Sequence, residues 1–139
     1  MLTIGPLQIP MHQHRAQLEY ELREKLILLR QRLLQVAKNE RHLWDLLLGS
    51  FSAFATLFRH ALIALGDASP RSKREAIETL ATRIQFDPSA LLQLLDIREH
   101  KAERKQFDAK DVFRRYLAAV QQVTTAVDTM LDAPGQGRA

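Results

Sequence analysis

The stretch LLLGSFSAFATLFRHALIAL, residues 46–65, decides the fold of this chain. Large side chains such as Phe51 and Phe58 alternate with small ones such as Gly49, so nearly every face of a helix with this sequence is apolar or small. A helix that is apolar all round is surrounded by other helices. We therefore expect a buried central helix, whose small residues let a neighbouring backbone come close.

The ends of this central helix carry recognisable signals. Asn39 is a good N-cap, and Gly66 stands where a helix commonly stops, so the helix is expected over residues 40–65. Its uncharged run, residues 46–58, is shorter than the roughly 20 residues that span a bilayer. The sequence therefore favours a core helix over a membrane span.

A long amphipathic helix is expected before it, over residues 11–38. Its apolar positions recur at spacings of three and four, and they are Leu18, Leu22, Leu26, Leu29, Leu33 and Val36. A second apolar set, Ile27, Leu28 and Leu34, widens the stripe. We expect the C-terminal half of this helix to be covered on two sides.

Three further helices follow. Ser72 and Glu75 have the spacing of a capping box ahead of a short third helix. Asp87 as N-cap and Pro88 as first helical residue predict a fourth. The polar residues 98–106 predict a solvated connection or a fraying helix end, and Asp108 caps a fifth helix that runs to about residue 131.

These elements predict an all-α protein of one domain. A chain of 139 residues is of the usual length for one domain, and five Gly and five Pro leave little material for a turn-rich β fold. We expect a bundle of about five helices over residues 11–131: two long outer helices, the buried central helix and a short pair. An irregular arm, residues 1–10, precedes it, and a disordered tail, residues 132–139, follows it.

The charge of +4 permits contact with nucleic acid but does not indicate it. The basic clusters are Arg71, Lys73 and Arg74, and Arg98, Lys101, Arg104 and Lys105. Neither has interleaved aromatic residues for base stacking, so we interpret both as solvated surface. The chain has no Cys and no basic start before an apolar run, which favours a reducing compartment and a cytoplasmic location.

The sequence offers few residues that could form a catalytic or metal-binding site. His12 and His14 would point to one side of an extended arm, but no third metal ligand stands near them, and zinc normally needs three. We therefore predict no catalytic, cofactor-binding or metal-binding residue. Arg59 and His60, which interrupt the apolar central helix, are the candidate residues for a groove or a partner contact.

Four stretches together resemble the helical C-terminal region of a bacterial family of uncharacterised nucleotidyltransferase-like proteins. They are RAQLEYELREKLILLRQRLL (residues 15–34), FSAFATLFRHALIALG (51–66), KREAIETLA (73–81) and FRRYLAAV (113–120). The similarity covers about residues 7–131. In that family a mixed α/β domain with a Gly-Ser and paired-Asp motif precedes the helices. Gly49 and Ser50 are not followed by such carboxylates, so no catalytic residue carries over.

The resemblance implies a non-catalytic helical module without a cofactor, which covers the substrate side of a nucleotidyltransferase catalytic domain or pairs with it as a separate subunit. A first alternative is a homodimer that buries Ile27, Leu28 and Leu34. A second is a helical enzyme or a ribonuclease-like toxin domain, which would need a cluster of acid, base or metal-binding groups.

Overall fold

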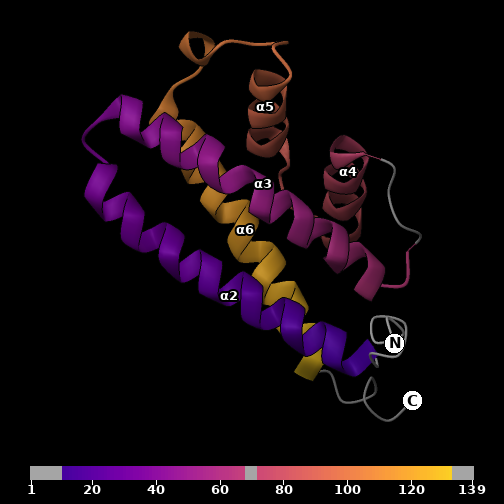
Figure 1. Ribbon diagram of the computed structural model, residues 1–139. Helices are drawn as coiled ribbons and strands as arrows, with labels where there is room; N and C mark the ends of the chain where they lie inside the picture. The colour runs from indigo at the N-terminus through magenta and orange to yellow at the C-terminus, as the bar shows by residue number, and fades with distance from the viewer. Residues whose placement is uncertain (1–10, 68–71, 133–139) are drawn as a thin grey trace, which may run out of the picture.

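The computed structural model describes residues 11–67 and 72–132, and within these ranges the protein consists of α-helices without strands (Figure 1). The helices are α2 (Met11–Val36), α3 (Glu40–Ala64), α4 (Lys73–Ile84), α5 (Ser89–Arg98) and α6 (Ala109–Asp132). The predicted all-α bundle is confirmed. The predicted arm, residues 1–10, and all of the predicted tail except Asp132 lie outside the described residues, and Asp132 ends α6.

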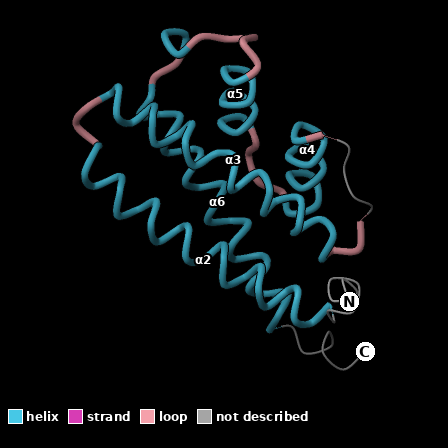
Figure 2. The backbone as a smooth tube through the Cα atoms, in the orientation of Figure 1, coloured by secondary structure: helices cyan, strands magenta, loops and turns pink. Residues whose placement is uncertain are grey.

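Helix α3 is the centre of the bundle. It forms an antiparallel hairpin with α2, and α6 lies behind both helices (Figures 1 and 2). The short helices α4 and α5 lie on the side of α3 that faces away from α2. Because α3 packs against α2, α4, α5 and α6, the expectation of a central helix is confirmed. The helix is not buried on every face, however, since Gly49 and Thr56 are exposed.

Three of the predicted caps form as expected. The side chain of Asn39 accepts a hydrogen bond from the backbone N–H of His42, and the side chain of Ser72 accepts one from Glu75. At the start of α6 the carboxylate of Asp108 accepts from the backbone N–H of Lys110 at 3.3 Å. Each bond satisfies an N–H group that the first turn of a helix leaves without a partner.

The start of α5 differs from the prediction by one residue. The N-cap is Pro88 and the helix begins at Ser89, whereas Asp87 was predicted as cap and Pro88 as first helical residue. The carboxylate of Asp87 still accepts from the backbone N–H of Ser89 at 2.9 Å. The polar segment before α6 is a connection, with a short 3₁₀ turn (Arg104–Gln106).

The core is one continuous apolar cluster. Its largest fully buried side chains are Tyr116, Phe51, Phe54, Phe58, Leu22, Leu43, Leu47, Leu62, Ile77, Leu80, Leu91 and Leu94. Among the described residues one helix, α3, is long and apolar enough to cross a membrane, a test that core helices of soluble proteins also pass. Four helices pack against α3, and 44% of its apolar window is buried inside the bundle.

Candidate docking groove

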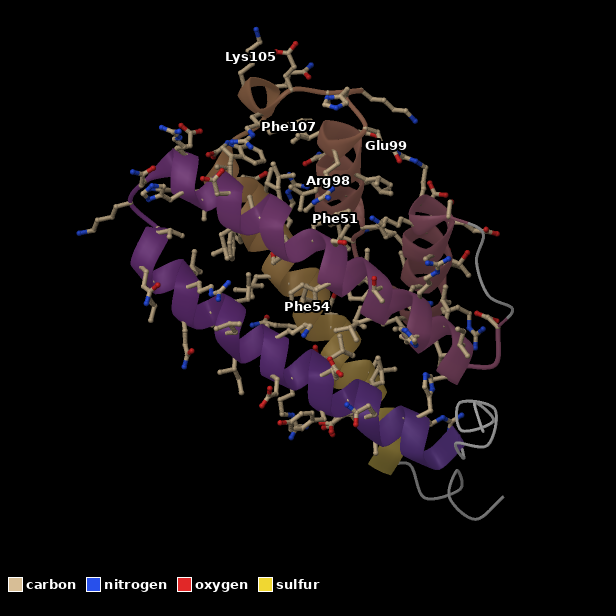
Figure 3. All side chains as sticks on the ribbon, viewed as in Figure 1. Phe51, Phe54, Arg98, Glu99, Lys105 and Phe107 are labelled. Carbon is tan, nitrogen blue, oxygen red and sulfur yellow. The ribbon has the colours of Figure 1, made fainter. Side chains whose placement is uncertain are left out.

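A half-open hollow of about 200 Å³ lies between α2 and α3. The wall from α2 consists of Lys25, Leu28, Leu29 and Arg32, and the wall from α3 consists of Leu46, Gly49, Ser50, Ala53 and Phe54. We call this hollow the groove. Figure 3 shows Phe54 between the ribbons of the two helices.

The groove exists because α3 presents small residues there. Gly49 is exposed, and a Cβ atom added to it would meet nothing within 4 Å. The expectation that the small residues let a neighbouring backbone come close is therefore wrong at Gly49 for the part of the chain that is described. The same helix is closed on its other sides, where Phe51 and Phe58 are fully buried.

The floor of the groove is neutral. The Ser50 hydroxyl donates to the carbonyl of Leu47 at 3.2 Å and therefore accepts from the hydroxyl of Tyr116, 2.7 Å away. Burial raises the pKa of Tyr116, and the hydrogen bond with Ser50 opposes this only in part. Beside this satisfied hydroxyl pair lies the ring of Phe54, which is 1% exposed and meets the Tyr116 ring edge-on at 6.0 Å.

Two cations stand on the α2 wall. Lys25 and Arg32 are seven residues apart, which is about 10 Å along a helix axis. The ammonium of Lys25 lies 3.6 Å from a carboxylate oxygen of Glu21, whereas Arg32 makes no hydrogen bond or ion pair with any described residue. No residue of the α3 wall carries a charge. The groove thus joins an apolar floor to a positively charged edge.

The apolar surface continues over α2. A second depression is lined by Tyr20, Glu21, Glu24, Lys25 and Leu28, so it shares Lys25 and Leu28 with the groove. Leu28 is 43% exposed. The two depressions thus adjoin each other at Lys25 and Leu28.

The outward face of α2 carries an apolar stripe that meets the second depression at Tyr20. Tyr20, Ile27 and Leu34 are spaced by seven residues and are 56%, 48% and 84% exposed. The expectation that the C-terminal half of this helix is covered on two sides is wrong for the described residues: one side faces the core, and Ile27 and Leu34 face outward. A run of exposed apolar residues on one helix indicates an interaction surface.

The predicted contact residues lie outside the groove. His60 is exposed, Arg59 is half-buried, and neither lines the groove. His60 lies instead beside His14 of α2, with Nδ1 of His60 3.4 Å from Nε2 of His14. Burial lowers the pKa of His14, and the positive charges of His60 and Arg15 lower it further.

The interpretation of His12 and His14 as a pair on an extended arm is wrong. Both residues belong to α2, so neither lies on an extended arm. His14 meets His60, which is 46 residues away in the chain. No group of three or more His, Asp or Glu side chains that could hold a metal ion occurs among the described residues.

Five residues of the two basic clusters, Arg74, Arg98, Lys101, Arg104 and Lys105, form ion pairs or hydrogen bonds with groups of the chain itself. Arg74 contacts Asp96 at 2.7 Å and Glu99 at 3.3 Å, and Arg98 donates to the carbonyl of Leu48 at 2.8 Å. Lys101 lies 3.2 Å from Glu99. These contacts favour the interpretation as solvated surface; Arg71 lies outside the described residues.

Sequence reasoning did not find the groove. Lys25, Leu28 and Arg32 follow the spacing of one helix face, which was the available signal, but nothing local indicates that Gly49 faces open space rather than a neighbouring helix. Comparison of the chain with protein-family models, curated proteins and solved structures finds no match.

Proposed function

We propose that this chain is a non-catalytic helical module that binds the catalytic domain of a nucleotidyltransferase through the groove between α2 and α3. The observation that carries the proposal is an open apolar groove with exposed Leu28 at its edge and a helix backbone accessible at Gly49. Concave apolar surfaces with few polar groups are typical of binding sites.

The class of partner rests on the sequence resemblance. The stretch of residues 15–34 supplies all of the α2 wall, and the stretch of residues 51–66 supplies Ala53 and Phe54 of the α3 wall. The segments that resemble the helical region of the nucleotidyltransferase-like family thus supply the α2 wall and part of the α3 wall, whereas Leu46, Gly49 and Ser50 lie outside them. A cytoplasmic site of action belongs to the same proposal and is supported by the absence of Cys.

Light scattering of this chain mixed with a purified catalytic domain of that family tests the proposal. We expect a complex whose mass is the sum of the two proteins. Gly49→Leu fills the groove and should weaken the complex at least about tenfold, because the apolar contact is replaced by a clash. Thr56→Leu, at an exposed position of α3 that does not line the groove, is the matched control. Failure of the unmodified chain to associate would contradict the proposal.

A homodimer is the second candidate function, favoured by the heptad spacing of Tyr20, Ile27 and Leu34 on the outward face of α2. Apolar residues spaced by seven can form a seam between two helices. Sedimentation over a series of concentrations tests it: a dimer that Ile27→Glu abolishes supports this candidate, and a monomer at every concentration rejects it.

A further inference from the structure

The chemistry of the groove indicates which kind of partner segment fits it. We propose that the groove binds an acidic amphipathic helix of the partner, which inserts one large apolar side chain and presents a carboxylate on either side of it. This inference rests on the proposed function and makes the partner's binding element specific.

The volume of the groove limits the size of the side chain that a partner can insert. An apolar cavity of about 150 Å³ takes up a benzene molecule. The hollow of about 200 Å³ therefore has room for one large side chain, such as Leu, Met or Phe. The neutral floor favours an apolar anchor, because the hydroxyls of Ser50 and Tyr116 are already bonded to each other and to the Leu47 carbonyl. A charged group placed on this floor would find no oppositely charged group there.

The shape of the α3 wall favours a helix as the binding element. Gly49 offers no side chain, so the axis of an incoming helix can approach closely at this point. Leu46 and Phe54 bound the open stretch on either side along α3. A helix lying in the groove between α2 and α3 presents side chains to both walls at once.

The positive charges of Lys25 and Arg32 favour a partner helix that carries carboxylates. Lys25 and Arg32 stand about 10 Å apart along α2, and two residues spaced by seven on a partner helix have the same separation. An anchor with carboxylates three residues before and four residues after it therefore reaches both cations. Arg32 should contribute more than Lys25, because Glu21 already lies 3.6 Å from Lys25 while Arg32 has no bonded partner among the described residues.

Labelled synthetic peptides test this inference. The probe is an alanine- and glutamine-rich helical peptide of 21 residues with the central motif Glu-Ala-Ala-Leu-Ala-Ala-Ala-Glu, followed by fluorescence anisotropy as this chain is added. We expect saturable binding that weakens at least about tenfold when the Leu becomes Ala or when both Glu become Lys, because apolar anchors dominate the affinity and charges the choice of partner. Added salt should weaken the binding of the acidic peptide.

Variants of the chain sharpen the test. Gly49→Leu should abolish binding of the acidic peptide, and Arg32→Glu should reverse the preference so that the Lys peptide binds better than the Glu peptide. Thr56→Leu should leave both affinities unchanged. Circular dichroism checks that each variant keeps its helix content, which we expect because all three changed positions are exposed.

Each outcome separates the inference from the proposed function. No binding of the acidic peptide, or equal binding of the acidic and basic peptides, overturns the inference. If the catalytic domain nevertheless binds and Gly49→Leu blocks it, the proposed function stands with a different binding element. If the peptide binds as expected and the catalytic domain does not, the acidic helix is retained and the nucleotidyltransferase partner is rejected.

Discussion

The two sides of α3 differ in whether neighbouring helices of the chain cover them. On one side Phe51, Phe58 and Leu62 are fully buried under neighbouring helices. On the other, Gly49 is exposed and Ser50 and Ala53 are half-buried, although the sequence is apolar or small on both sides. An apolar helix face thus indicates a contact, but the surface that covers it can belong to a partner rather than to the chain itself.

The closed side should give the largest loss of stability when it is disturbed. Phe58→Ala removes a fully buried ring that packs against the rings of Phe54 and Phe86, with centroids 6.5 and 6.1 Å away. Such a cavity costs about 3–5 kcal/mol of unfolding free energy. Urea denaturation followed by circular dichroism measures it, and a loss below about 1 kcal/mol would mean that this side is not the packed core.

Removing one or the other hydroxyl of the Ser50–Tyr116 pair should lower the unfolding free energy by different amounts. Ser50→Ala leaves the buried hydroxyl of Tyr116 without its partner and should cost about 1–3 kcal/mol. Tyr116→Phe should cost less, because Ser50 keeps its bond to the Leu47 carbonyl and lies at the groove. Equal losses of unfolding free energy in the two variants would show that the pair is not shielded from water.

Adding a side chain on the open side of α3 should instead raise the unfolding free energy of the protein. Gly49→Ala replaces a glycine inside a helix at a point with free space, so we expect about 0.5–1 kcal/mol of additional unfolding free energy. The same change at a closed position would be destabilising through overpacking. A lower melting temperature for Gly49→Ala would indicate that another segment occupies the groove.

The contact between α2 and the last turns of α3 should depend weakly on pH. The pKa of His14 is lowered from 6.5 in the folded chain, so the unfolded chain binds more protons and the unfolding free energy falls as the pH drops below 6.5. This contribution is complete above 6.5. It is the smallest expected effect, since the pair is partly exposed. His14→Gln should flatten the dependence between pH 7.5 and 5.5, and an unchanged slope in this variant would contradict the prediction.

Local signals account for the part of the fold that could be predicted. Asn39, Ser72 and Asp108 act through bonds to residues two or three positions away, so the sequence contains all of their geometry. Helix α5 begins one residue later than the sequence predicts. The Asp87 carboxylate accepts a hydrogen bond from the backbone N–H of Ser89, although Pro88 rather than Asp87 is the N-cap residue.

The site could not be predicted in the same way, because its features depend on distant contacts. His14 meets His60 across 46 residues, and the groove at Gly49 depends on how far α2 stands from α3. Arg59 and His60 do not line the groove, so their role in a partner contact stays a prediction.

One labelling experiment tests the central claim that the chain leaves the groove side of α3 open for a partner. The chain has no Cys, so Gly49→Cys and Ala61→Cys each introduce a single thiol, on the open and on the closed side. We predict that the thiol at position 49 reacts with Ellman's reagent at least about 100-fold faster than that at position 61, and that the catalytic domain slows only the former. Equal protection of both thiols in the free chain would contradict the account.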